Sequence, residues 1–321
     1  MALPSLLEGT LRLPLIGAPM FIVSGPELVI AQCNAGIVGS FPALNARPQE
    51  ALLDWIRQIK EETAAYAEAN PDEPVAPFAV NQIAHPSNPR LMADMEACVR
   101  EEVPIIITSL NPPADIVQAV HAYGGLVFHD VINLRHARKA ISQGVDGVIA
   151  VCAGAGGHAG MLNPFALVGE IRKEYDGCVI LSGCISRGDD VLAATAMGAD
   201  LAYAGTRFIA SAEARAVPAY KDMIVDSAAA DIVYSSYFTG VHGNYLAGSI
   251  ANSGMDPADL PEAGKEKMDF AGATDTSAKA WKDIWGAGQG VGNIDDVTPA
   301  HDIALHMEQE YRDALARVGA G

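Results

Sequence analysis

One histidine in this chain lies in a segment otherwise built only of glycine and alanine. The segment is Ala153 to Gly160, Ala-Gly-Ala-Gly-Gly-His-Ala-Gly, and it comes after the apolar run 147–151. Glycine loses much conformational entropy on folding and adds no packing, so such a cluster indicates a sharp turn or the close approach of a ligand. An imidazole with a pKa near neutrality can accept or donate a proton there. We therefore interpret His158 as a catalytic residue, with a structural imidazole as the alternative.

Two other short segments place small residues and hydroxyl groups directly after apolar runs. Ser182 and Gly183 are followed by Ser186, and Gly205 is followed by Thr206. Backbone N–H groups in turns of this kind can hold a dianionic phosphate. The two segments together indicate a flavin or sugar phosphate. Ordinary turn or capping roles are the alternative, above all for Ser186.

The glycine cluster also fits the dinucleotide-binding spacing G-x-G-x-x-A through Gly154, Gly156 and Ala159. Two observations disfavour that interpretation. The cluster falls on the sixth strand–helix unit instead of the first, and the next helix is expected to begin only at Pro164. The phosphate is therefore expected at the two later segments.

The elements that position these residues follow a repeating pattern. Runs rich in Val, Ile and Leu alternate with helical segments that often begin at proline and end at glycine, as in βα units of a parallel sheet. Eight such units in the first 210 residues, with strands apolar on both faces, predict a (β/α)8 TIM barrel at residues 1–210. Residues 211–321 are predicted to form a C-terminal helical and loop cover packed over the barrel mouth. The predicted strands are Leu15–Pro19, Ile37–Ser40, Phe78–Asn81, Ile105–Ser109, Leu126–His129, Gly147–Val151, Val179–Ser182 and Leu201–Gly205.

Barrel geometry gives these segments a common location. Catalytic groups lie at the carboxyl ends of the strands, and phosphate groups commonly lie in the loops after strands seven and eight. His158 follows predicted strand six, Gly183 follows strand seven, and Gly205 ends strand eight. We therefore expect all three to line the same mouth of the barrel.

Composition excludes several classes of protein. The 321 residues carry a formal net charge of -18, which opposes binding to nucleic acid or anionic lipid surfaces. No apolar run is long enough to span a membrane, and the N-terminal residues lack the pattern of a signal peptide, so we expect a cytoplasmic protein. The five cysteines form no Cys-x-x-Cys pair, and we expect neither disulfides nor a metal site.

Taken in order, six motifs resemble those of the nitronate monooxygenases, the FMN-dependent family formerly called 2-nitropropane dioxygenases. The resemblance covers essentially the whole chain. The motifs are Ala18-Pro19-Met20, Asn81-Gln82, Ala155-Gly-Gly-His-Ala-Gly, Ser182-Gly183, Ala204-Gly-Thr-Arg-Phe and Gly288-Gln-Gly-Val-Gly.

The resemblance implies a TIM barrel that holds FMN over its strand ends. It implies a set of residues that border the cofactor, with the phosphate near Gly183, Gly205 and Thr206. That cofactor-binding set is Ala18, Pro19, Met20, Asn81, Gly156, Gly157, Ser182, Gly183, Gly205, Thr206, Gln289 and Gly290. The activity implied is oxidation of alkyl nitronates such as propionate 3-nitronate by dioxygen, giving a carbonyl compound and nitrite or nitrate. His158 matches the histidine that acts on the nitro or nitronate group in the family.

The resemblance also implies substrate contacts and one departure from the family pattern. His85, His242 and Tyr245 are candidate substrate contacts, with loop capping for His85 and packing of a lid for the other two as alternatives. Many relatives carry a lysine near the flavin at the position of Asp130. A carboxylate there removes a cation that would favour the reduced flavin, so tuning of the cofactor is expected to differ.

Two other functions stay open. The first is an FMN-dependent NAD(P)H oxidoreductase that reduces a quinone or an enoyl thioester, because enoyl reductases that share this barrel carry a similar glycine–histidine loop. The second is a non-catalytic barrel that binds a sugar phosphate or a nucleotide. The expected partners are a small substrate and dioxygen, and a homodimer is one compatible assembly.

Overall fold

Eight parallel strands form the central barrel of the computed structural model, which describes residues 3–111, 114–261 and 282–320. The strand order is β1-β9-β8-β6-β5-β4-β3-β2. A parallel bridge between Ile16 and Val38 joins the two end strands, with Gly17 N–H donating to the Val38 carbonyl at 2.7 Å. The predicted (β/α)8 TIM barrel is therefore confirmed. Its strands are β1 (Leu15–Gly17), β2 (Gly39–Pro42), β3 (Phe78–Ala84), β4 (Ile105–Leu110), β5 (Leu126–Val131), β6 (Gly147–Val151), β8 (Cys178–Ser182) and β9 (Leu201–Ala204).

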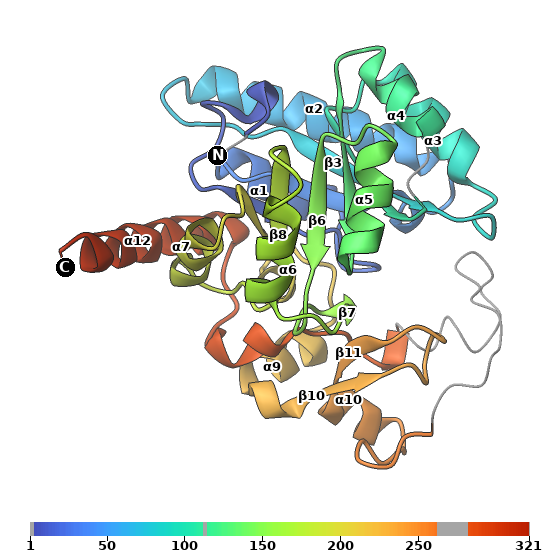
Figure 1. Ribbon diagram of the computed structural model, residues 1–321, viewed down its shortest axis with the longest axis vertical. Coiled ribbons are helices and arrows are strands. Elements are labelled where there is room, and N and C mark those ends of the chain that lie inside the picture. The colour runs from blue at the N-terminus through green and yellow to red at the C-terminus, as the bar shows by residue number, and fades with distance from the viewer. Residues whose placement is uncertain (1–2, 112–113, 262–281, 321) are drawn as a thin grey trace.

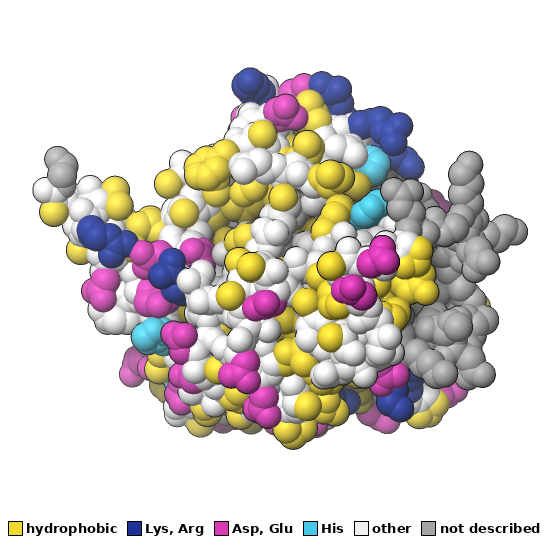
Figure 2. Space-filling view, turned by 90° about the horizontal axis from the view of Figure 1, so that it is seen from below, with side chains coloured by type: hydrophobic (Ala, Val, Ile, Leu, Met, Phe, Trp, Pro, Cys, Tyr) yellow, Lys and Arg dark blue, Asp and Glu magenta, His cyan; other side chains and the backbone are white. Residues whose placement is uncertain are grey.

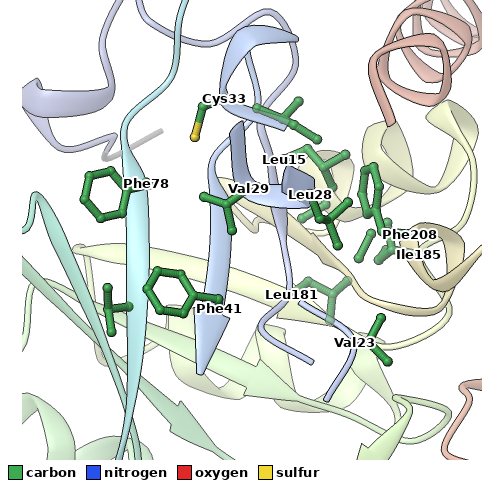
Figure 3. Close-up of a cluster of buried hydrophobic side chains, with 14 of the residues drawn as sticks. Leu15, Val23, Leu28, Val29, Cys33, Phe41, Phe78, Leu181, Ile185 and Phe208 are labelled. Carbon is green, nitrogen blue, oxygen red and sulfur yellow. The ribbon is translucent and has the colours of Figure 1, made fainter. Parts of the chain in front are cut away.

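Helices cover the outside of the barrel and bury apolar side chains against its strands. One large cluster lies between strands and helices, and Figure 3 shows Phe41 of β2 and Phe78 of β3 in it near Val29 of the first helix. Burial of such side chains stabilises the fold by about 1.5–3 kcal/mol each. The helices of this layer are α1 (Pro26–Asn34), α2 (Ala51–Ala69), α3 (Leu91–Arg100), α4 (Ala114–His121), α5 (Leu134–Ser142), α6 (Pro164–Arg172), α7 (Gly188–Ala196) and the short α8 (Thr206–Ile209).

The C-terminal helix α12 (Ala300–Gly319) completes this ring of helices, because it packs against both α7 and α1. Gly188 at the start of α7 lies against its backbone: a Cβ atom there would be 2.0 Å from the Met307 carbonyl oxygen. The Gly188 N–H also donates to Glu310 Oε2 at 2.7 Å. A segment far along the chain therefore fills the place between the seventh and first helices.

Residues 218–252, which lie between β9 and α12, form a structure at one end of the barrel that we call the cap (Figure 1). The β6 arrow points toward the cap, so the cap lies at the carboxyl ends of the strands. Its elements are α9 (Pro218–Asp226), the 3-10 helix η3 (Ala229–Asp231), β10 (Ile232–Ser235), β11 (Gly243–Leu246) and α10 (Ala247–Asn252). Part of the predicted cover, residues 262–281, lies outside the described residues.

Acidic side chains are spread over the face of the molecule seen from the cap end, while Lys and Arg lie toward its edges (Figure 2). This distribution agrees with the net charge of -18. Among the described helices, none has the length and apolar character needed to cross a membrane.

Candidate active site

The side chains that face the inside of the barrel change from apolar to polar toward its carboxyl end. A buried cluster that includes Ile16, Ala79, Ile107, Phe128 and Ile180 fills the interior. Alternate residues of a strand face the same side, so the next inward-facing residue of each strand lies two positions further on. These next residues are Ala18, Asn81, Ser109, Asp130, Ser182 and, from β9, Gly205 after Tyr203. Four of the predicted cofactor-binding residues therefore share one layer at the mouth.

Three polar residues of this layer form a chain of hydrogen bonds across β3, β4 and β5. Asn81 Nδ2 donates to Ser109 Oγ at 2.9 Å, and Ser109 Oγ donates to Asp130 Oδ2 at 2.7 Å. Burial raises the pKa of Asp130 to about 6, and the hydrogen bond from Ser109 opposes that rise. From β9, Tyr203 also has a raised pKa because it is buried and feels the Asp130 charge. By contrast, His129 faces away from the interior and lies within 2.8 Å of Thr108 Oγ1.

The loops after β8 and β9 present backbone N–H groups at the mouth. Gly183 and Cys184 have positive φ values of 136° and 58°, which turns the chain sharply after Ser182. Within the described part of the chain, the N–H groups of Gly183, Gly205 and Thr206 donate no backbone hydrogen bond. Such groups can bind an anion.

Gly205 has room for a Cβ atom. The atoms nearest to such a Cβ would be Ala18 Cβ at 3.5 Å and Met20 Sδ and Cγ at 3.7 and 3.8 Å, which are ordinary contacts. The protein itself therefore does not require glycine at this position.

The hydroxyl groups of Ser186 and Thr206 bind the backbone of a later segment of the chain. Ser186 Oγ donates to the Gly290 carbonyl at 2.9 Å, and Thr206 Oγ1 accepts from Gly288 N–H at 2.9 Å. Both bonds fasten residues 286–293, which we call the closing loop and which includes the 3-10 helix η4 (Gln289–Asn293). A direct role for Ser186 in a phosphate cradle is thus disfavoured, because its proton is already used.

The loop after β1 is held by a residue that the sequence did not single out. Ala18 N–H donates to the Ala204 carbonyl at 2.8 Å, which places Ala18 and the half-buried Pro19 beside β9. Asn45 Nδ2 donates to the Met20 carbonyl at 2.9 Å and also, at 2.9 Å, to the carbonyl of Ser24. Asn45 therefore fixes the loop that carries Ala18, Pro19 and Met20.

The glycine–histidine loop contains a short strand that the sequence did not reveal. Gly157 and His158 form β7 and pair antiparallel with Asn244 and Gly243 of β11, so a three-stranded sheet β10-β11-β7 joins the loop to the cap. Gly157 has a φ of 65°, which favours glycine. Asn244 Nδ2 donates to the buried carbonyl of Ala155 at 2.6 Å. The cap therefore fixes the backbone on either side of the imidazole.

Thr239 of the cap contacts the imidazole of His158. His158 Nε2 lies 2.8 Å from Thr239 Oγ1, and the Thr239 hydroxyl donates to the Val241 carbonyl at 3.0 Å. A hydroxyl has one proton, so when that proton lies on the Val241 carbonyl, Nε2–H of His158 is the donor to Thr239 Oγ1. Burial lowers the pKa of His158 to about 4. The expected pKa near neutrality is wrong for this structure, because the sequence does not show how far the ring is removed from water.

The glycines of this loop allow the closing loop to approach. A Cβ on Gly156 would lie 2.9 Å from the Gly288 nitrogen, and a Cβ on Gly288 would lie 2.6 Å from the Gly154 carbonyl oxygen. Gln289 N–H donates to that same carbonyl at 2.9 Å. Contact between two backbone segments therefore accounts for Gly156, while the Gln289 side chain is exposed beside it.

The three candidate substrate contacts lie in different environments. His85 interacts through Nδ1 with Ser87 Oγ at 2.8 Å within its own loop. His242 is exposed and stacks on Tyr234 with ring centroids 5.0 Å apart. Tyr245 is fully buried in the cap, edge-on to Phe238. Burial raises its pKa, and a hydrogen bond with Thr239 opposes that rise. Tyr245 shares Thr239 with His158, and the backbone carbonyl of His242 accepts from the N–H of Ala159 at 3.3 Å.

This arrangement, a glycine-rich loop with a histidine and polar side chains at the carboxyl ends of eight parallel strands, is that of a TIM-barrel enzyme. The family model for nitronate monooxygenase matches residues 5–310. The chain therefore belongs to the nitronate monooxygenase family, whose members are flavin-dependent oxidoreductases.

Individual relatives agree with the family match. A nitronate monooxygenase of Paraburkholderia phytofirmans is 27% identical over 95% of this chain and 94% of that protein. Nitroalkane oxidase from Streptomyces ansochromogenes superposes with a TM-score of 0.78 at 23% identity, covering 98% of this chain and 100% of that one. FabK from Thermotoga maritima gives a TM-score of 0.77 at 24% identity, covering 98% of this chain and 97% of that one. The two superpositions establish the fold alone.

Proposed function

We propose that the protein binds FMN at the barrel mouth and oxidises alkyl nitronates, such as propionate 3-nitronate, with dioxygen to a carbonyl compound and nitrite or nitrate. The observation that carries the proposal is the position of His158 in a chain of this family. Its neutral imidazole is fixed by Thr239 and β11 at the end of β6, where barrel enzymes bind their substrates.

The residues present at the mouth fit FMN. The N–H groups of Gly183, Gly205 and Thr206 suit a phosphate dianion, and they follow the seventh and eighth barrel strands, where phosphate sites are common. Ala18 and Met20 lie next to Gly205, at ordinary contact distance from where its Cβ would be. When bound, FMN supplies the acceptor for the electrons of the nitronate and passes them to dioxygen.

His158 handles the proton of the substrate. Its ring is neutral at pH 7, and a neutral imidazole can accept the proton from a neutral nitroalkane. The nitronate that results is an anion, and its charge favours the protonated imidazole. The proton is thus held on the imidazole, while the contact of Nε2 with Thr239 keeps the ring oriented. For a substrate that arrives as the nitronate, the same ring serves to orient it.

An absorbance spectrum and two assays test the proposal. The purified protein should carry the spectrum of a bound flavin and consume oxygen with propionate 3-nitronate. Rapid bleaching of the flavin by NADH or NADPH without air, with no nitronate-dependent oxygen uptake, would instead establish the NAD(P)H oxidoreductase. A flavin-free protein that gains stability with sugar phosphates would establish the non-catalytic barrel.

Gly205→Val tests the location of the cofactor. The added side chain enters the space beside Ala18 and Met20 and should reduce FMN content at least tenfold. Gly169→Val in α6 is the matched control, because a Cβ there meets nothing within 4 Å. Full FMN content in Gly205→Val would show that the cofactor lies elsewhere.

A further inference from the structure

The carboxyl group of Asp130 lies at the inner wall of the barrel, at the end of a chain of hydrogen bonds. Its Oδ2 accepts the hydrogen bond from Ser109, but among the described residues its buried Oδ1 has no hydrogen-bond partner. Ser109 Oγ, which donates to Oδ2, itself accepts from Asn81 Nδ2, so the chain of hydrogen bonds from β3 and β4 ends at this carboxyl group. A buried polar atom without a partner costs about 1–3 kcal/mol, so such an atom at a ligand site indicates a group that the ligand completes.

No cation compensates the carboxyl group within the described part of the chain. Its neighbours on β3 and β4 are the uncharged Asn81 and Ser109, and on the inner side of β6 they are the apolar Ile149 and Val151. From β9, the titratable group that acts on Asp130 is Tyr203, a phenol that is neutral at pH 7 and whose pKa burial raises further. A negative charge at this point is therefore opposed by its surroundings.

We propose that Asp130 is protonated when the barrel mouth is filled and that Oδ1–H donates a hydrogen bond to a carbonyl oxygen of a flat heterocyclic ligand, which is the ring of FMN if the proposed function holds. This inference deepens that function. A carboxylic acid can stabilise negative charge that develops on the ring as it is reduced, whereas a carboxylate would oppose it. Asp130 would thus stabilise the reduced ring as a neutral hydrogen-bond donor, where many relatives carry a lysine cation.

The proposal predicts that ligand binding takes up a proton. In the free protein the pKa of Asp130 is about 6, so the group is mostly ionised at pH 8 and must gain a proton on binding. If it stays protonated in the complex, the dissociation constant of FMN should rise roughly 50-fold between pH 6 and pH 8. Protonation of the FMN phosphate also changes with pH, but it affects a variant without the carboxyl group equally. The ratio of the dissociation constants of the two proteins therefore reports the contribution of Asp130 alone.

The experiment compares the wild type with Asp130→Asn, whose amide can donate the same hydrogen bond without titrating. FMN is titrated into each protein, stripped of cofactor, at pH 6 and pH 8, and its fluorescence is followed. The ratio of wild-type to variant dissociation constants should rise at least tenfold over this range. An unchanged ratio with normal FMN binding overturns this inference alone. Failure of both proteins to bind FMN overturns the proposed function as well.

Infrared spectroscopy of the loaded wild type gives a second readout that needs no variant. The loaded protein should show the carbonyl band of a protonated carboxylic acid at pH 8. Labelling aspartate with 13C should shift that band and so assign it to an aspartic acid. Absence of such a band contradicts the proposal even if Asp130→Asn fails to fold.

Discussion

The bond between Asn244 and Ala155 gives the most direct handle on how the cap holds the glycine–histidine loop. The Asn244 side chain is 2% exposed, and its Nδ2 donates to the Ala155 carbonyl at 2.6 Å. Asn244→Ala removes the donor and leaves that carbonyl buried without a partner, which costs about 1–3 kcal/mol. Because the bond joins the loop to β11, we expect much of this loss to favour local opening of the loop.

Hydrogen exchange measured by mass spectrometry on peptides spanning 153–160 reads this opening. The N–H groups of Ala155, Ala159 and Gly160 are hydrogen-bonded in the closed loop. A loss of 1–3 kcal/mol should reduce their protection by about 5- to 150-fold, since 1.4 kcal/mol is a factor of ten. The nitronate-dependent turnover should fall in parallel.

Asn70→Ala is the matched control for this prediction. Asn70 Nδ2 donates to the Tyr66 carbonyl at 2.9 Å at the end of α2, so the variant loses the same kind of bond elsewhere. Protection of the loop should not change in this control. Unchanged protection in Asn244→Ala, or an equal loss in Asn70→Ala, would refute the reasoning that the cap holds the loop.

Three further outcomes are expected. Thr239→Val should lower turnover at least fivefold with FMN content intact, because the hydrogen bond that orients the ring, worth about 1 kcal/mol, is lost. The variant should also change the 15N NMR signature of the His158 tautomer. Thr239→Ser keeps the hydroxyl group and should preserve both the turnover and the NMR signature. Gly188→Ala should lower the free energy of unfolding, measured by urea denaturation, by about 3 kcal/mol or more, because the new Cβ would lie 2.0 Å from the Met307 carbonyl oxygen. An unchanged free energy of unfolding would contradict the packing of α12 against α7. Because the pKa of His158 is lowered to about 4 in the folded protein, the unfolded chain takes up a proton first, and the free energy of unfolding should fall as the pH drops from about 6.5 to 4. This fall should be about 3 kcal/mol larger in the wild type than in His158→Asn. Equal curves for the two proteins would contradict the burial of the ring.

The sequence predicted the barrel because buried parallel strands read as continuous apolar runs punctuated by glycine and proline. All eight predicted strands correspond to strands of the barrel, although boundaries differ, as where β2 spans Gly39–Pro42 and not residues 37–40. Strand alternation then places Ala18, Asn81 and Ser182 in one layer. The local pattern of apolar runs, glycines and prolines was therefore sufficient to predict the strands and the residues at the barrel mouth.

What the sequence did not reveal depends on contacts between distant segments. The pairs His158–Thr239 and Ala155–Asn244 are 81 and 89 residues apart, and no periodicity links them. The strand β7 exists because β11 pairs with it, in a stretch whose glycines favour no strand by themselves. The lowered pKa of His158 has the same origin, since burial of the ring follows from the fold.

Oxygen uptake by His158→Asn tests the central assignment most directly. The variant protein and the wild type are compared for FMN content and for the rate of oxygen consumption with a neutral nitroalkane and with propionate 3-nitronate. We predict full FMN content and a turnover at least tenfold lower, about 1.4 kcal/mol in the barrier, with the larger loss for the neutral nitroalkane. Unchanged rates with both substrates would contradict a catalytic role for His158.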